Sequence, residues 1–392
     1  MKRNENMAEK QPRAERADTA SHRERGTGER PAPPPNRKRD AGERPAPPSL
    51  PKESDFRNAQ LDLFQQFLCN TESERGFLSN IFDIWDSVPR YSVSRQAMQK
   101  MRAAKGFLDI LEIDFTYRGT DLKAVIHPAR VKGADGATLD YYPGANEELV
   151  EDALRKMAAE QYIGYFDKPN HRSGVVFTLH MLRDELRKRG HARSYQQIVL
   201  SLNILSGSII ELRAADGSAS KSFTRTPYFP SLSAVSRKSL ESDPKAKWMV
   251  QFHPLVTQSI DVIGYRQFNY HQMMGHTTQL ARWLHKQLSL KYTMASLTTH
   301  FEMRYSTIKR NSGLLENYNP ERKAVAALDE AFEDLRQQNV LLTVGKRVAT
   351  GPRGKIEDVA YVVTPTIEFV KQMKAANKRL SEAVDKSGKT CA

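Results

Sequence analysis

The side chains in this sequence with the potential for chemistry are mainly cations and amides, and few of them suit bond making. Segment Gly388–Thr390 looks like the end of a phosphate-binding loop, but Ala383 stands where the first glycine of that loop belongs. Acid pairs such as Glu147-Glu148 fall where a helix starts, which is a common structural position for carboxylates. The ten histidines show no metal-ligand spacing. We therefore expect no enzyme activity, no metal and no cofactor, and we expect surface or cap positions for His271, His276 and His285.

A first cluster of cations and amides surrounds a helix predicted to begin after Ser194. Arginine and lysine suit phosphates, whereas glutamine and asparagine can form two hydrogen bonds with adenine. The alternative is a solvated helix end, favoured by the helix dipole, with the amides as ordinary surface residues. The candidates for contact with DNA are Arg187, Lys188, Arg189, Arg193, Tyr195, Gln196, Gln197 and Asn203.

A second and denser cluster surrounds a helix predicted from Asn319 to about Gln338. Arg322 and Lys323 oppose the dipole at its N-terminus, which is unfavourable unless an anion such as a phosphate lies nearby. A solvated face is again the alternative. The candidates here are Arg304, Tyr305, Ser306, Thr307, Lys309, Arg310, Arg322, Lys323, Lys346, Arg347, Arg353 and Lys355.

The elements expected to position these two clusters follow the same order twice. Apolar residues at helical or alternating spacing predict a helix-turn-helix and then a hairpin in each case. The first set comprises helices over 146–157, 181–188 and 194–205 and strands over 162–166, 174–178, 209–214 and 221–226. The second comprises a strand over 247–252, helices over 277–290, 295–303 and 319–338, and strands over 340–344 and 359–363 around a basic loop over 345–355.

This order is typical of the winged helix. One helix enters the major groove of DNA, and the hairpin, called the wing, reaches the backbone or the minor groove beside it. We therefore predict an α+β fold with two tandem winged-helix domains. Their expected bounds are 77–243 and 244–370, followed by a basic C-terminal helix or tail over 371–392.

Composition supports a polyanionic partner. The 392 residues carry a formal net charge of +14 and no apolar run of the length that spans a membrane. Residues 1–58 hold nine of the twenty prolines and repeat the heptapeptide GERPAPP, which predicts a disordered tail. No secretory signal is evident, and only Cys69 and Cys391 occur. We expect a cytoplasmic protein without a membrane partner.

A short amphipathic peptide lies in the predicted linker over 59–76. Its residues are Gln60, Leu61, Asp62, Leu63 and Phe64. It resembles the QL(S/D)LF peptide by which bacterial polymerases and their accessory proteins bind the replicative sliding clamp. The alternative is the start of a core helix, because Phe67 and Leu68 follow.

From about Ser79 to Val370 the chain resembles the plasmid replication initiators with tandem winged helices, of the TrfA and RepC types. The resemblance is clearest from Phe252-His253-Pro254-Leu255 through the segment ARWLHKQL at 281–288. It implies binding to repeated origin sequences called iterons, help in melting an adjacent AT-rich region, and recruitment of the host helicase and sliding clamp. A homodimer is possible. The rival interpretations are a transcriptional repressor built from the same modules and, in a different class, a relaxase or helicase.

Overall fold

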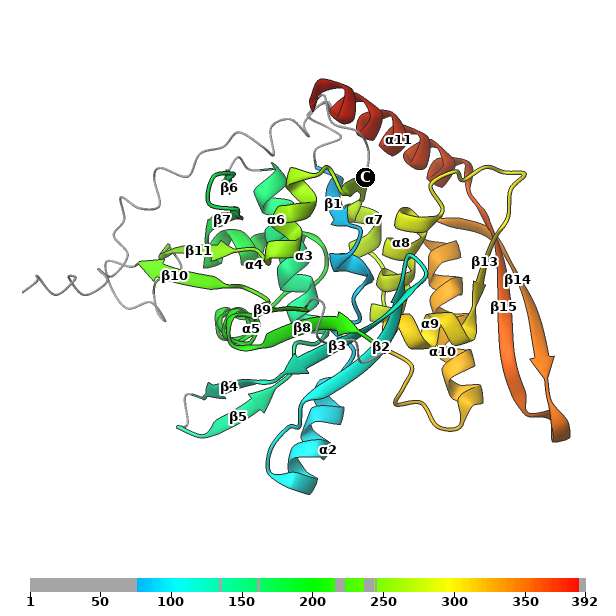
Figure 1. The fold of residues 1–392 in the computed structure, drawn as a ribbon, viewed down its shortest axis with the longest axis horizontal. Coiled ribbons are helices and arrows are strands. Elements are labelled where there is room, and N and C mark those ends of the chain that lie inside the picture. The colour runs from blue at the N-terminus through cyan, green and yellow to red at the C-terminus, as the bar shows by residue number, and fades with distance from the viewer. Residues whose placement is uncertain are drawn as a thin grey trace, which may run out of the picture. The chain divides into compact units, whose positions relative to one another are not determined.

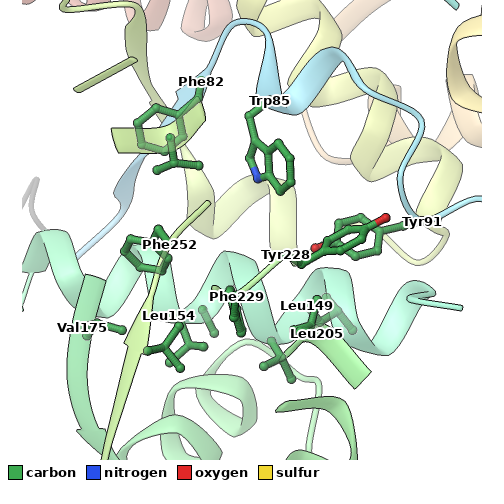
Figure 2. Packing of buried hydrophobic residues seen from close by; sticks show 14 of the residues in the cluster. Phe82, Trp85, Tyr91, Leu149, Leu154, Val175, Leu205, Tyr228, Phe229 and Phe252 are labelled. Atoms are coloured by element: carbon green, nitrogen blue, oxygen red, sulfur yellow. The ribbon is translucent and has the colours of Figure 1, made fainter. Parts of the chain in front are cut away.

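Buried apolar side chains gather into two hydrophobic clusters. A computed structural model describes residues 76–133, 136–160, 163–215, 223–235, 243 and 245–387. The first cluster runs from Ile81 to Met274 and also takes in Leu290. Figure 2 shows Trp85, Leu154 and Phe252, which are far apart in the sequence, meeting in this core. The second cluster runs from Leu280 to Met373.

The first cluster is organised around three helices and a hairpin. Helices α3 (Ala145–Glu160), α4 (Leu179–Lys188) and α5 (Tyr195–Gly207) come first, and strands β8 (Ile209–Ala214) and β9 (Phe223–Pro227) follow. Ile198, Leu202 and Leu205 turn the inner face of α5 into this core. The predicted helices and the strand pair after them are therefore present, with bounds within a few residues of those expected.

Two sheets and two strand pairs make up the rest of this half, and they combine strands that the sequence pattern predicted, such as those over 162–166, 174–178 and 247–252, with others that it did not. Strands β2 (Leu111–Tyr117), β3 (Thr120–His127), β8 and β9 form one sheet in the order β2-β3-β8-β9. A second sheet has the order β10-β11-β7-β6, with β10 Ser231–Val235, β11 Lys247–Gln251, β7 Arg172–Thr178 and β6 Gly164–Asp167. The remaining elements are β1 (Leu78–Phe82), paired with β12 (Tyr265–Asn269), the pair β4 (Ala129–Lys132) and β5 (Thr138–Tyr141), the short helix η3 (Trp85–Ser87), and helices α2 (Arg95–Lys105), α6 (Pro254–Asp261) and α7 (Tyr270–Met274).

The second cluster again has three helices followed by a pair of strands (Figure 1). Its elements are α8 (Gln279–Lys291), β13 (Phe301–Arg304), α9 (Tyr305–Ser312), α10 (Glu321–Gln337), β14 (Leu341–Thr350), the one-turn helix η4 (Pro352–Gly354), β15 (Ile356–Pro365) and α11 (Ile367–Ser387). The sheet order is β13-β15-β14. The two halves thus differ in pairing, because the first strand of the hairpin is central in one sheet and the second strand is central in the other.

Two predicted elements of this half are wrong. Residues 295–303 do not form a helix: Phe301 starts strand β13, which pairs with β15 from Phe301↔Val363 onward, and the helix lies later, at Tyr305–Ser312. The hairpin is also longer than expected. Lys346 and Arg347 therefore lie within strand β14 and not in the loop at its tip. The first error arises because strand pairing between β13 and β15, which are distant in sequence, overrides local helical spacing. The second arises because the pairing of β14 with β15 continues past Val344 to Thr350.

The boundary predicted between residues 243 and 244 does not separate the two hydrophobic clusters. Strand β11 pairs with β7, with Trp248 opposite Phe177, and β12 pairs with β1. Residues 247–274 consequently pack with the first cluster, and the second begins at Leu280. The C-terminal helix also starts earlier than position 371 and contributes Phe369 and Met373 to the second core.

A network of buried charges lies between α3, η3 and α8. The Arg155 guanidinium donates to both carboxylate oxygens of Asp86, at 2.8 and 3.0 Å. The Lys286 ammonium, on α8, lies 3.1 Å from Glu148 Oε1 and 2.6 Å from Asp152 Oδ2, both on α3. Because Lys286 is buried and α8 otherwise belongs to the second core, these bonds tie the two clusters together.

Candidate nucleic-acid interface

The N-terminus of α10 presents unpaired cations. Arg322 and Lys323 are exposed, and no acidic partner contacts either of them within the described part of the chain. On the opposite face Ala324, Val325 and Leu328 are buried in the second core and fix the orientation of the helix. The exposed positions that continue the outer face are Ala326, Glu330 and Glu333. On the outer face of α10, positive charge is therefore found in the first turns, where the small side chain of Ala326 would let a partner approach the helix closely.

The hairpin tip lies at the same end of the second module as the N-terminus of α10 (Figure 1). Lys355 near the tip is exposed. Closer to the base of the hairpin, the cations are paired: Lys346 Nζ lies 2.7 Å from Asp329 Oδ2, and Arg347 donates to Glu302 Oε2 at 2.5 Å. The side chain of Arg347 remains largely exposed despite this ion pair.

Helix α9 starts from a carboxylate cap that the sequence pattern did not identify. The amide nitrogen and hydroxyl of Ser306 donate to Asp358, at 3.0 and 2.8 Å, which joins the start of α9 to strand β15. Burial acts to raise the pKa of Asp358, but these hydrogen bonds outweigh it and lower the pKa. Arg304 and Lys309 flank this start and each contacts one glutamate, at 3.3 and 3.5 Å. The cap fixes the start of α9 against strand β15.

Three other predicted residues of this module lie where contact with DNA is not favoured. The Tyr305 ring is buried in the core, and its hydroxyl donates to Glu321, so Tyr305 is a structural residue. Thr307 and Arg310 line a cavity beside strand β2, on the side of α9 that packs against the first module. There Asn311 Oδ1 accepts from the Thr116 amide at 3.0 Å. The side chain of Arg353 is not among those described.

In the first module, the exposed outer face of α5 carries amides. Gln196 and Asn203 are exposed. Gln197 is also exposed, but its Oε1 accepts from the Ser194 amide at 2.9 Å, while Ser194 Oγ accepts from the Gln197 amide. This reciprocal capping box confirms the predicted helix start. The side-chain nitrogen of Gln197 thus remains available for a contact with DNA, while its side-chain oxygen is bound in the cap.

Most cations near α5 already have partners. Arg189 is mostly buried and binds Glu185, His271 and the carbonyl of Gly76, so it is a structural residue and not a contact for DNA. Arg193 donates to Asn146 Oδ1 at 2.8 Å and is half-buried. Arg187 pairs with Asp184, while Lys188 is exposed.

The aromatic candidate of this module, Tyr195, is half-buried, and the Arg183 guanidinium lies 4.7 Å from the centre of its ring. Arg183 lies on α4, one turn before Arg187. Sequence reasoning missed Arg183, and the four-residue spacing from Arg187 is the only signal that could have identified it.

The histidines expected at the surface or at caps include two that are buried. His276 Nε2 is hydrogen-bonded to His285 Nδ1 at 2.9 Å, and His276 Nδ1 to Asp334 Oδ1 at 3.0 Å. Asp334 Oδ2 also accepts from the amide and hydroxyl of Thr277. Burial lowers the pKa of both imidazoles. This chain of bonds joins the start of α8 to α10 and corrects the expectation for both histidines.

Two absences among the described residues bear on the class of site. No group of three or more histidine, cysteine or acidic side chains there is placed to hold a metal ion. No helix in the same residues combines the length and apolar character needed to cross a membrane.

Comparison with known proteins shows likeness to three solved structures. No family model matches the chain, and no curated protein matches it. A structure of selenomethionine derivatives of domains 2 and 3 of RctB has a TM-score of 0.43 and 10% identity, covering 67% of this chain and 92% of that one. A second structure, of RctB domains 2–3, has a TM-score of 0.40 and 12% identity, and the match covers 68% of this chain and 95% of that one. The structure of the Pi initiator protein in complex with iteron DNA has a TM-score of 0.39 and 12% identity, and the match covers 62% of this chain and 98% of that one.

Proposed function

We propose that this chain is a replication initiator that binds repeated double-stranded DNA at an origin through two winged helices. The observation that carries DNA binding is the pair of exposed cations Arg322 and Lys323 on the first turn of α10, which have no acidic partner among the described residues. Cations at a helix N-terminus are unfavourable alone and become favourable when a phosphate binds there. The hairpin β14–β15 beside this helix end acts as the wing.

In this proposal each half contributes one reader helix. Helix α10 enters a major groove with its N-terminal turns, because Glu330 and Glu333 on its later turns would be repelled by phosphates. Helix α5 enters another groove, where Gln196 and Asn203 read base edges and Lys188 holds the backbone. Because the buried ion pairs of Lys286 join the two clusters, the spacing between the readers is set by the fold.

Recruitment of the replication machinery is proposed on the peptide Gln60–Phe64, which lies outside the described residues. Its glutamine, two leucines and terminal phenylalanine match the clamp-binding pattern and would fill an apolar pocket of the bacterial sliding clamp. This peptide distinguishes an initiator from a repressor built on the same DNA-binding modules. Host helicase or initiator proteins are further proposed partners.

The experiment that tests DNA binding compares Arg322→Ala/Lys323→Ala with the matched variant Arg336→Ala. Arg336 is exposed on the last turn of the same helix and pairs with Glu333. In electrophoretic shifts on direct repeats from the DNA around its own gene, the double variant should bind at least about tenfold more weakly. The slope of the logarithm of its binding constant against the logarithm of the salt concentration should become shallower by about 0.9 for each phosphate that the variant no longer neutralises. Equal binding by both variants would exclude α10 as a reader.

The initiator role has its own test. A plasmid carrying the repeats and the gene should persist in a host that otherwise cannot replicate it, and the double variant should fail to maintain it. Strong binding without origin-dependent maintenance would favour the repressor. No preference for the repeats over random duplex would end the proposal as a whole.

A further inference from the structure

A cavity of about 710 Å³ opens between the two hydrophobic clusters and has no place in the DNA-binding proposal. Its lining comes from the β2–β3 turn, from α6 and β12, from the end of α8, and from α9 and α11. The volume falls within the range of sites for small molecules and cofactors. A ligand held here would contact elements of both halves at once.

The charges that line this cavity are unbalanced. Four cations line it, and Asp83 is the one acid in the lining as described. Asp83 Oδ2 is already committed, because it accepts from the Tyr117 hydroxyl and lies 2.8 Å from the Arg118 guanidinium. The other cations, which have no carboxylate partner among the described residues, are Arg266, Lys291 and Arg310.

Two of these cations are affected by burial, and their neighbours compensate for it only in part. Arg266 donates to Asn377 Oδ1 at 2.6 Å, but its Nε is buried and makes no hydrogen bond within the described part of the chain. Burial lowers the pKa of Arg266, and it lowers the pKa of Lys291 despite the attraction of Asp83. The Lys291 side chain still reaches solvent, so the cavity mouth is open. Withdrawing a cation from water is unfavourable until an anion pairs with it.

The walls beside these cations are apolar. Leu255, Val262, Ile263 and Leu290 line the same cavity, together with the ring of Tyr265. A bare inorganic ion would leave these walls uncovered. A ligand with a charged phosphate and a flat or apolar body would satisfy both parts of the lining.

We propose that this cavity binds a nucleoside phosphate, with its phosphates on Arg266, Lys291 and Arg310 and its base and sugar against the apolar wall. Because the lining comes from elements of both halves, with α9 and α11 on one side and β2–β3, α6 and β12 on the other, the bound nucleotide would hold these elements in one arrangement and raise the stability of the folded chain. This site is separate from the proposed reader helix, since Arg322 and Lys323 do not line it.

The test is isothermal titration calorimetry of the full-length protein with ATP, and with inorganic phosphate as the second probe. Lys291 makes no hydrogen bond among the described residues, so Lys291→Gln should fold normally, with an unchanged Tm without ligand. It should weaken ATP binding about tenfold or more, as expected when one charge-assisted hydrogen bond is removed. Arg266→Gln should weaken it similarly. Lys371→Gln, on an exposed position of α11 outside the cavity, should have no effect.

Three outcomes would overturn the proposal. The first is that ATP fails to bind, or binds Lys291→Gln and Arg266→Gln as tightly as the parent. The second is that inorganic phosphate binds as tightly as ATP, which would mean that the apolar wall contributes nothing. The third is that ATP binding disappears in Arg322→Ala/Lys323→Ala and persists in the cavity variants, which would place the nucleotide on the DNA-binding face.

Discussion

Replacing Lys286 with methionine removes the buried cation that joins α8 to α3. The Lys286 ammonium lies within 3.1 Å of Glu148 Oε1 and 2.6 Å of Asp152 Oδ2, and all three side chains are buried. Methionine keeps the apolar stem, so the main change is the removal of the charge. Breaking a buried ion pair from one side typically costs about 3–5 kcal/mol, because the remaining charge is left uncompensated. We expect the free energy of unfolding at neutral pH to fall by about that amount.

The pH dependence of this deficit distinguishes an electrostatic origin from a packing defect. Burial acts to raise the pKa of Glu148, but attraction to Lys286 and Arg282 outweighs it and lowers the pKa below 4.5. A carboxyl group with a lowered folded pKa stabilises the fold above its unfolded pKa, and the stabilisation is lost as the pH falls through the folded value. The variant lacks most of this contribution. Its deficit in the free energy of unfolding should therefore narrow as the pH falls below about 4.

Urea unfolding followed by circular dichroism measures both effects. Lys371→Met is the matched control, because Lys371 is an exposed lysine on α11. It should leave the free energy of unfolding unchanged to within about 0.5 kcal/mol. A Lys286→Met deficit below about 1 kcal/mol at neutral pH, or one that stays constant as the pH falls well below about 4, would refute a coupling of the clusters by buried charge.

Three further predictions concern other named residues. Asp358→Ala removes the cap of α9 and should lower the free energy of unfolding by about 1 kcal/mol, while the neighbouring exposed Glu357→Ala should not; equal urea midpoints would contradict the cap. Because burial lowers the pKa of His276 and His285, the unfolded chain binds more protons in mild acid, so stability should fall as the pH drops below about 6.5. His285→Gln should make that dependence shallower, and an unchanged slope would rule out this origin. Leu63→Ala/Phe64→Ala should abolish capture by immobilised sliding clamp and leave DNA affinity intact, whereas loss of both would mean that the peptide belongs to the core.

Helices with one apolar face were predicted well because their signal is local. The positions expected to point inward on α8 and α10, such as Leu284, Leu288, Leu328 and Phe332, are all buried. The start of α5 was also predicted, because a serine followed three residues later by glutamine is a capping box in any context. Strand β8 has the predicted bounds for the same reason, since its alternation is visible within six residues.

Helix α3 shows where local reasoning stops. Its charged residues Glu148, Glu151, Asp152 and Arg155 have the spacing of a solvated face, yet all of them are buried. They are buried because η3 and α8 cover that face and supply opposite charges from distant parts of the chain. The same dependence on distant partners placed β13 where a helix was expected and moved residues 247–274 into the first cluster.

Periodicity and composition were enough to predict a mixed helix and sheet fold, most of its helices and strands, and the positive charge of the chain. They were not enough to predict which cations are free. Arg189, Lys346 and Arg347 look equivalent to Arg322 in the sequence, but partners far along the chain bind them. Whether a cation meets a carboxylate depends on three-dimensional proximity, which sequence spacing does not encode. The folded arrangement therefore leaves Arg322 and Lys323, at the N-terminus of α10, exposed and without an acidic partner among the described residues.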